Sequence, residues 1–175
     1  MSQLNETLEL MQTRRSVRDF KPDMVPEDIL DKIIEAGLWA ASGRNRQSPI
    51  IIKVTDKSVR DRLSRLNAEI MGTDSDPFYG APAVLIVLAD KNAPTYLYDG
   101  SLVMGNLMNA AFSLGVDSCW IHRAREVFQT EEGKALMKKW GLGEEYIGIG
   151  NCILGYGDKP LPQAKPRKEG FVIRA

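Results

Sequence analysis

The chain has 175 residues, and 23 lysines and arginines balance 23 aspartates and glutamates, so its formal net charge is +0 at pH 7. This length suits one domain with an apolar core, and the balanced charge argues against a protein that binds nucleic acid or anionic lipid through a general positive field. A hydrophobic fraction of 43% and a charged fraction of 26% are typical of a folded globular protein and exclude a disordered chain.

The first part of the chain predicts two helices. Apolar residues repeat at helical spacing after Ser2, which we expect to cap a first helix that ends near Thr13; they are Leu4, Leu8 and Met11. A second helix should begin at Pro26, because two acidic residues follow the proline, and it should end in the polar loop at 42–45.

The rest of the chain predicts strands that alternate with helices. A β-branched run predicts a strand at 50–55, Asp56 opens a helix, and 72–80 should form a loop. The continuous apolar run at 83–89 indicates a strand that is covered on both faces. The further expected elements are a helix at 98–114 that is apolar on most sides, a strand at 116–121, a helix at 130–140, a strand at 147–156 and a polar tail that ends in a strand-like segment at 171–173. We expect residues 1–175 to form a single domain, with 157–175 as a C-terminal arm.

The sequence also bears on the compartment. The first ten residues lack a basic segment followed by an apolar one, and the apolar run at 81–89 is about half the length of a membrane-spanning helix. Cys119 and Cys152 lie in apolar segments and form no CxxC pair, which favours reduced core residues over a zinc site. We therefore expect a cytoplasmic protein with no metal centre and no membrane contact.

Two cationic clusters stand at opposite ends of the chain. Residues 14–18 hold three arginines and Ser16, a set that suits a phosphate because arginine makes planar, multi-donor contacts with it. The alternative is a solvated basic turn that pairs with scattered acids. A second cluster at 165–168 is by itself typical of a solubilising tail, and the two together suggest that both meet one phosphate.

Two further segments carry chemistry. At 42–47, Gly43 permits a tight turn, while Asn45 and Gln47 suit the edge of a flat heterocycle; the alternative is that Gly43 caps a helix, which leaves the two amides unexplained. At 119–123 a strand end delivers an aromatic ring, an imidazole and a guanidinium group, although a lone histidine there is more often structural. The chain contains no dinucleotide fingerprint, Walker loop, GxSxG elbow or convincing acidic pair.

Four motifs in order resemble those of the FMN-dependent nitroreductase superfamily: RRSVRDF after the first helix, SGRNRQSP, the long apolar helix, and GYGDKPLPQAKPRK near the end. The resemblance covers nearly the whole chain. It implies an α+β fold, a nitroreductase-like three-layer sandwich with a mixed central sheet flanked by helices. It also implies an intertwined homodimer that exchanges C-terminal arms and holds FMN at the subunit interface.

The resemblance implies the following contacts with FMN. Near the phosphate and ribityl chain it places Arg14, Arg15, Lys165 and Arg167. On the pyrimidine side of the flavin it places Ser16 and Arg18. From the partner subunit it brings the residues equivalent to Ala41, Ser42, Gly43 and Asn45. Near flavin N5 it places Trp120, Ile121 and His122, and at the ring edge Asn67.

The activity that the resemblance implies is a ping-pong reaction. NADH or NADPH would give a hydride to flavin N5, and a nitroaromatic, quinone or similar electrophile would then take the electrons in the same pocket. Because the chemistry is on the flavin, no side chain is expected to act as an acid or nucleophile, while Arg18 would stabilise the negative charge near N1 and O2. The alternatives are a flavoenzyme of the same fold with different chemistry, such as reductive dehalogenation or flavin fragmentation, and, far behind, a non-enzymatic anion or nucleic-acid binder that uses the two cationic clusters.

The chain departs from the superfamily pattern at three places. Many members have Pro-Trp after the glutamine of the loop, whereas Ser48 and Pro49 follow Gln47 here. The Glu-Gly-Phe segment of larger members is absent, and 120–123 stands in its region. The helical insertions that cover the pocket are missing or reduced, so we expect an open pocket that is gated only by the loop from Thr73 to Tyr79.

Overall fold

The computed structural model describes residues 5–175. Its helices are α1 (Glu6–Thr13), α2 (Glu27–Leu38), α3 (Lys57–Met71), α4 (Tyr96–Ser113), α5 (Ala124–Gln129) and α6 (Glu131–Lys139), with a short 3-10 turn η1 (Gly43–Asn45). Its strands are β1 (Pro49–Val54), β2 (Ala83–Asp90), β3 (Asp117–Ile121) and β4 (Tyr146–Gly155). The sequence predicts each of these helices and strands within a few residues, except α5. None of the helices within residues 5–175 is long and apolar enough to cross a lipid bilayer.

Side chains at the helix starts explain where several elements begin. Asn5 caps α1 by accepting a hydrogen bond from the Leu8 backbone at 3.0 Å, whereas the predicted cap Ser2, with Leu4, lies outside the described residues. Asp56 caps α3, as predicted, by accepting from the Val59 N–H at 3.0 Å. Pro26 stands at the N-cap of α2, which ends at Leu38. Gly43 therefore does not cap α2, and that alternative is wrong.

The four strands form one sheet in the order β1-β2-β4-β3, and every neighbouring pair is antiparallel. The mixed sheet that we expected is therefore not present among the described strands; the parallel pairing there is a single bridge between Ser16 and Ser118. The prediction that 83–89 is covered on both faces is confirmed, because every residue of β2 from Ala83 to Ala89 is buried. Helices on both faces produce this burial without parallel neighbours.

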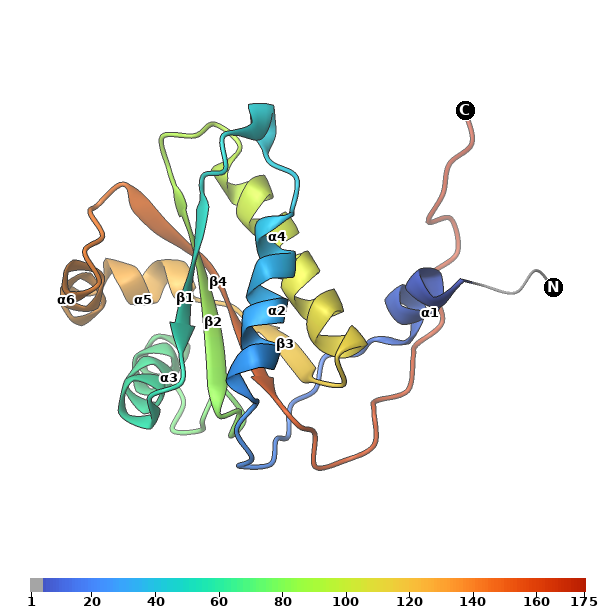
Figure 1. The fold of residues 1–175 in the computed structure, drawn as a ribbon, viewed down its shortest axis with the longest axis horizontal. Helices are drawn as coiled ribbons and strands as arrows, with labels where there is room; N and C mark the ends of the chain where they lie inside the picture. Colours follow the sequence, from blue (N-terminus) through green and yellow to red (C-terminus); the bar gives the residue numbers. More distant parts are fainter. Residues whose placement is uncertain (1–4) are drawn as a thin grey trace.

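Helices cover both faces of the sheet and give three layers, as expected (Figure 1). On one face α2 and α4 pack against alternate residues of β2, including Leu85 and Val87. On the other face α3, α5 and α6 pack against Val84, Ile86 and Leu88. This period-two alternation is what a strand at the centre of a sandwich requires.

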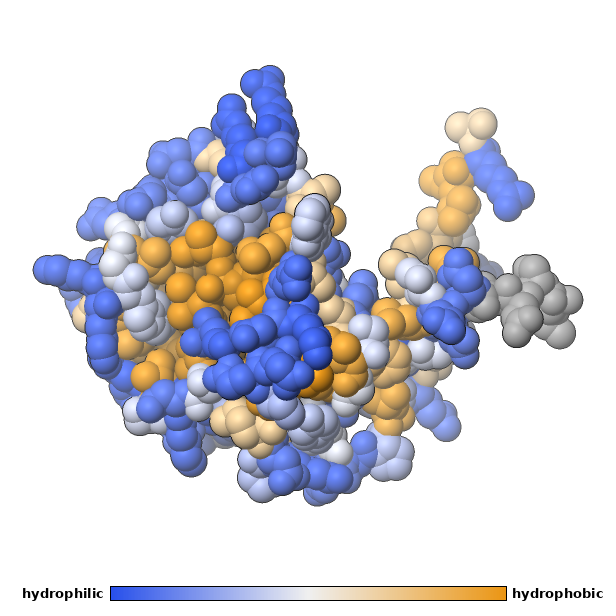
Figure 2. Space-filling view, viewed as in Figure 1, coloured by the Kyte–Doolittle hydropathy of each residue, from blue (hydrophilic) through white to orange (hydrophobic). Residues whose placement is uncertain are grey.

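The two edges of the sheet differ. Residues 16 and 17 pair with the outer edge of β3, where the Val17 N–H donates to the Ser118 carbonyl at 3.1 Å, and Phe20 and Lys21 pair with residues 156–157 just after β4. The outer edge of β1 pairs with no strand of the described chain, and its three consecutive isoleucines, Ile50 to Ile52, are only partly buried. Figure 2 shows hydrophobic residues gathered on the face where β1 lies in Figure 1.

Both ends of the described chain project from the body on the same side (Figure 1). No residue of α1 is buried. The C-terminal arm, residues 157–175, is exposed along almost its whole length, and the predicted strand-like segment at 171–173 pairs with nothing in the protomer. Ile173 is 90% exposed.

Candidate functional site

The basic segment, residues 14–18, lies along β3. Val17 is buried in the core on the α3 side of the sheet and Ser16 forms the bridge to Ser118, so these two residues fix the segment to the sheet edge. Successive residues of an extended chain point to opposite sides, so Ser16 and Arg18 turn away from the core that holds Val17. Ser16 is half-buried and Arg18 is exposed.

Two arginines of the basic segment act on the thiols of the core. Burial raises the pKa of Cys119, and the positive charges of Arg18 and Arg14 oppose this shift. Burial also raises the pKa of Cys152 to about 12, with Cys119 adding to the shift and Arg14 opposing it. The bridge from Ser16 to Ser118 places the basic segment beside β3, and the effects of Arg14 and Arg18 on these thiols agree with that placement.

These two arginines lack acidic partners. Within residues 5–175, neither Arg14 nor Arg18 forms an ion pair with an acidic side chain. The alternative of a basic turn that pairs with scattered acids therefore does not describe them. Arg15 differs, because its Nη1 donates to the carbonyls of Gln12 and Arg14 at 2.7 Å and folds back on the end of α1.

Several buried polar side-chain atoms on or near β3 have no hydrogen-bond partner. Among the described residues, four buried side-chain atoms have no hydrogen-bond partner: Arg14 Nη1, Asn67 Oδ1, Ser118 Oγ and Trp120 Nε1. Ser118 and Trp120 belong to β3, Arg14 lies against it, and Asn67 contacts the residue that follows it. Unpaired buried polar groups are costly and rare in folded proteins. All four belong to β3, to the segment beside it or to the side chain that holds the residue after it.

The end of β3 presents two rings on one face. Trp120 and His122 are two residues apart, and their ring centroids lie 6.1 Å from each other. A Cβ at Gly150, on the neighbouring strand, would clash with the indole nitrogen, so glycine is required there for Trp120 to pack. Ile121 points to the other side and is buried in the core, which leaves its backbone as the part available to a ligand.

Asn67 reaches this segment from α3. Its side chain is 0% exposed, and its Nδ2 donates to the His122 carbonyl at 2.7 Å. Asn151 on β4 adds longer contacts from Nδ2 to the Ile121 and His122 carbonyls, at 3.4 and 3.5 Å. The predicted contact of Asn67 with a ring edge stays a prediction that rests on its unpaired Oδ1. We call the set around β3 the β3 site: Arg14, Ser16, Arg18, Asn67, Ser118, Trp120 and His122.

The 42–48 loop is not part of the β3 site within one protomer. Its Gly43 N–H donates to Asp99 in the first turn of α4, whereas α1 packs against Asn109 and Ala110 near the other end of that helix. Eleven residues of helix correspond to about 16 Å. Figure 1 accordingly shows η1 and α1 near opposite ends of α4.

The side chains of this loop mainly contact one another. Ala41 and Asn45 are exposed, and Ser42 and Gly43 are half-buried. The two amides that suited a heterocycle edge form a hydrogen bond with each other, from Gln47 Nε2 to Asn45 Oδ1, at 3.1 Å.

The second cationic cluster is exposed. Lys165 and Arg167 lie in the C-terminal arm, and Arg167 donates to the Lys165 carbonyl at 2.7 Å. The protomer does not bring these two side chains onto the arginines of the basic segment.

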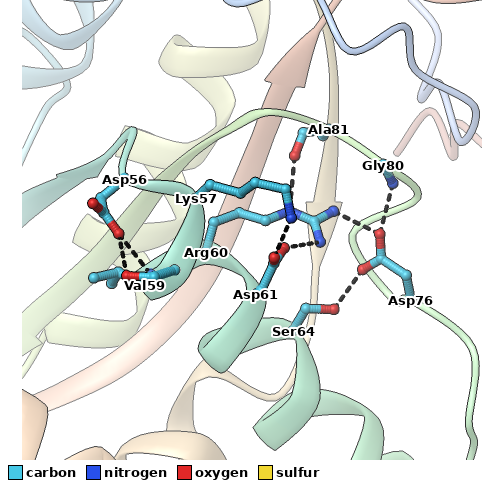
Figure 3. A network of polar contacts seen from close by, with 10 residues as sticks. Asp56, Lys57, Val59, Arg60, Asp61, Ser64, Asp76, Gly80 and Ala81 are labelled. Atoms are coloured by element: carbon cyan, nitrogen blue, oxygen red, sulfur yellow. Dashed lines mark hydrogen bonds and ion pairs between the residues drawn. The ribbon is translucent and has the colours of Figure 1, made fainter.

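Hydrogen bonds hold part of the loop at 72–80 in place, whereas a loop that gates a pocket has to move. Asp76 accepts hydrogen bonds from Arg60 at 2.6 Å, from Ser64, and from the Gly80 N–H at 2.7 Å (Figure 3). It also accepts from the Phe78 N–H at 2.9 Å. Burial by itself would raise the pKa of Asp76, but these hydrogen bonds hold it below its ordinary value. Phe78 is buried in the core. The expected gate at Thr73–Tyr79 is therefore fixed from Asp76 onward.

Comparison with known proteins shows which family this chain is similar to. A profile of the nitroreductase family matches residues 11–77. A protein of Archaeoglobus fulgidus, whose name gives NADH dehydrogenase or NAD(P)H nitroreductase as candidate activities, is 29% identical over 159 residues, which cover 87% of this chain and 86% of that protein.

Solved structures agree over nearly the whole fold. A nitroreductase with bound FMN from Bacteroides fragilis superposes with a TM-score of 0.90 at 27% identity and covers 98% of this chain and 100% of its own. An iodotyrosine deiodinase bound to FMN and 3-iodo-L-tyrosine superposes with a TM-score of 0.76 at 25% identity and covers 97% and 98%. The order of the motifs, the three-layer fold and these alignments agree, and the chain is similar to nitroreductase-family proteins over nearly its whole length.

Proposed function

We propose that this protein is an FMN-dependent NAD(P)H oxidoreductase that binds the flavin at the β3 site. The observation that carries the proposal is a set of three unpaired buried polar atoms on or next to β3, together with two arginines that lack acidic partners, one of which, Arg14, has a buried Nη1 without a partner. Flavin mononucleotide offers what these groups lack, namely phosphate oxygens for guanidinium groups, carbonyl oxygens for an indole N–H and a hydroxyl, and a ring N–H that the Asn67 Oδ1 can accept from. The residues present therefore fit the cofactor.

We propose that each side chain of the β3 site contacts a different part of FMN. Arg14 would hold the phosphate or ribityl chain, and Ser16 and Arg18 would face the pyrimidine edge, where a fixed positive charge stabilises added electrons. The backbone from Ile121 to His122, which Asn67 holds, would orient the ring. FMN, when bound, supplies the hydride acceptor and donor at N5, so no acidic or nucleophilic side chain is needed.

For the acceptor we propose a nitroaromatic, a quinone or a similar electrophile. In the two-electron reaction NAD(P)H and a proton reduce a quinone to a hydroquinone, or a nitro group to a nitroso group and water. Reductive dehalogenation is the second candidate, because the likeness to an iodotyrosine deiodinase extends over 97% of this chain.

We also propose a homodimer in which the site is completed by the partner. The 42–48 loop and the β3 site are separated by most of α4, so one protomer cannot bring both to one flavin. Large apolar side chains are exposed beside the loop, with Trp39 82% exposed and Tyr98 70%. The C-terminal arm projects from the body with an apolar end, and the edge of β1 is open to a further strand. Arm exchange would cover both apolar surfaces, and a parallel strand at that edge would make the sheet mixed.

The visible absorption spectrum of the purified protein tests the cofactor. We expect a yellow protein whose flavin bands bleach on anaerobic addition of NADH or NADPH. A colourless protein that takes up no added FMN would rule the proposal out.

Reoxidation of the bleached protein distinguishes the acceptors. Under anaerobic conditions, the bands should return on addition of a quinone or a nitroarene. Return only with a halogenated phenol, together with halide release, would favour dehalogenation instead. Loss of the flavin itself on reduction in the presence of oxygen would favour flavin fragmentation.

A further inference from the structure

The 42–48 loop has an unusual backbone. Three of its residues that are not glycine, Arg44, Asn45 and Gln47, adopt positive φ angles of 53°, 53° and 52°. Side chains other than glycine rarely adopt this left-handed conformation, which persists only where surrounding contacts impose it. Within the loop, the Gln47 N–H donates to Ser42 Oγ at 3.1 Å. The conformation therefore depends on contacts that hold both ends of the loop.

One buried carboxylate holds both ends. Asp99 is 3% exposed, and its Oδ1 accepts from the Gly43 N–H at 2.9 Å. Its Oδ2 accepts from the Ser48 hydroxyl at 3.2 Å and from the Thr95 hydroxyl at 2.9 Å. The three donors satisfy an acid that would otherwise be costly to bury. Gly43 begins the loop and Ser48 ends it, so the carboxylate bridges its two ends.

The loop also packs closely on the start of α4. A Cβ at Gly43 would clash with the Thr95 side chain, so the glycine allows the backbone to approach the helix. Asp99 follows the exposed Tyr98 and stands one turn before the exposed Leu102. The buried acid thus links the surface proposed for dimerisation to the loop that carries Ser42 and Asn45.

We infer that Asp99 is a positioning residue, which keeps the 42–48 loop in the shape that contacts FMN in the partner subunit. This inference rests on the proposed function. The role is distinct from that of a helix-stabilising acid, because it predicts an effect on the loop and on flavin affinity beyond any effect on stability.

Trypsin provides a readout on the loop that needs no flavin. Arg44 and Arg46 are exposed within the loop and are trypsin sites. In the flavin-free protein, Asp99→Ala should speed cleavage at these two residues by about tenfold or more, because local opening no longer breaks the three hydrogen bonds. Cleavage at Arg167 and Lys168 in the exposed C-terminal arm should not change and serves as the internal control.

The second readout is FMN affinity, measured by quenching of flavin fluorescence with the full-length protein. We expect Asp99→Ala to raise the Kd by about tenfold or more, and Asp99→Asn, which keeps an acceptor for the Gly43 N–H, to restore part of the affinity. Asp56→Ala is the matched control: it removes the cap of α3 and should lower the melting temperature without changing the Kd. If Asp99→Ala does not fold, Thr95→Val removes one donor and should shift both readouts in the same direction by less.

The outcomes separate this inference from the proposed function. Wild-type protein that binds FMN, with Asp99→Ala unchanged in loop cleavage or in Kd, would overturn the role of Asp99 alone. If Asp56→Ala lost as much FMN affinity as Asp99→Ala, Asp99 would only stabilise the fold, and its positioning role would be overturned as well. Wild-type protein that binds no FMN would overturn the proposed function and this inference together.

Discussion

Single residues define the candidate site through groups that the protein does not satisfy by itself. Arg14 and Arg15 are neighbours with the same side chain, but Arg15 donates to backbone carbonyls at the end of α1, whereas Arg14 Nη1 is buried without a partner. The unpaired atom identifies Arg14 as the arginine to expect at a ligand.

Arg14→Ala should therefore weaken FMN binding strongly. A charge-assisted hydrogen bond to phosphate is worth about 1.5–3 kcal/mol, which corresponds to roughly a tenfold increase in Kd or more. Titration followed by flavin fluorescence measures this. Arg167→Ala should act in the same direction if the arm reaches the phosphate, while Lys53→Ala, which removes an exposed partner of Glu27 and Asp31, should have no effect. Unchanged affinity in both arginine variants would place the phosphate elsewhere.

At the scale of elements, loops are fixed by buried polar contacts to a neighbouring helix. Asp76 ties the 72–80 loop to α3 through Arg60, whose guanidinium also donates to the Ala81 carbonyl at 2.9 Å (Figure 3). The same guanidinium lies 5.4 Å from the centre of the Phe78 ring. Asp99 ties the 42–48 loop to α4 in a similar way. In both cases the acid accepts hydrogen bonds from the backbone of the loop.

Asp76→Asn should lower the free energy of unfolding at pH 7 by about 1–3 kcal/mol, because Arg60 loses its charged acceptor. The folded protein holds the pKa of Asp76 below the ordinary value of 3.8. The stabilisation from its charge is therefore complete above that value and is lost as the pH falls through the lower pKa of the folded state. Urea unfolding of the wild type and of Asp76→Asn measures this. The difference between their free energies of unfolding should become smaller below about pH 4.

A matched control lies in the same loop. Asp74 forms no hydrogen bond or ion pair with a described side chain, so Asp74→Asn should leave the free energy of unfolding unchanged. The role of the carboxylate charge would be contradicted if the free energies of unfolding of Asp76→Asn and the wild type were equal. It would also be contradicted if they differed by the same amount at pH 7 and at pH 3.

At the scale of the whole molecule, the protomer leaves surfaces that a second copy would cover. The C-terminal arm makes few contacts with its own body, and its apolar end is exposed. A charged residue at the apolar end of the arm should not destabilise an isolated protomer, because side chains at that end already face water.

Ile173→Asp therefore tests the dimer without disturbing the protomer. If the arm packs against a partner, the variant buries a charge and should shift sedimentation equilibrium toward monomers, with loss of bound FMN. Gln163→Asp adds the same charge to the exposed arm outside its apolar end and should change neither. A wild-type protein that sediments as a monomer would remove the partner's contribution to the site.

Local patterns were sufficient for most helices and strands, because caps, periodicity and apolar runs act within a few residues. They were not sufficient for α5, whose six residues are too few to show a helical period and which is held by the burial of Ala124, Val127 and Phe128 against the sheet. The prediction of a mixed sheet was wrong for the four strands of one protomer, which pair antiparallel. The direction in which strands pair depends on how distant segments run past each other and not on their own composition.

By itself the sequence determined the likeness to nitroreductases, the order of the elements and the candidate residues for a phosphate contact, since each of these depends on residue type and local spacing. Only the tertiary structure decided which of those residues lack partners, because hydrogen bonding depends on neighbours from distant segments. It separated Arg14 from Arg15, paired Asn45 with Gln47, and brought Asp99 to both ends of a loop that lies about fifty residues earlier in the chain. An acid in an apolar helix was the one local signal of that last role, and only the fold shows which donors it meets.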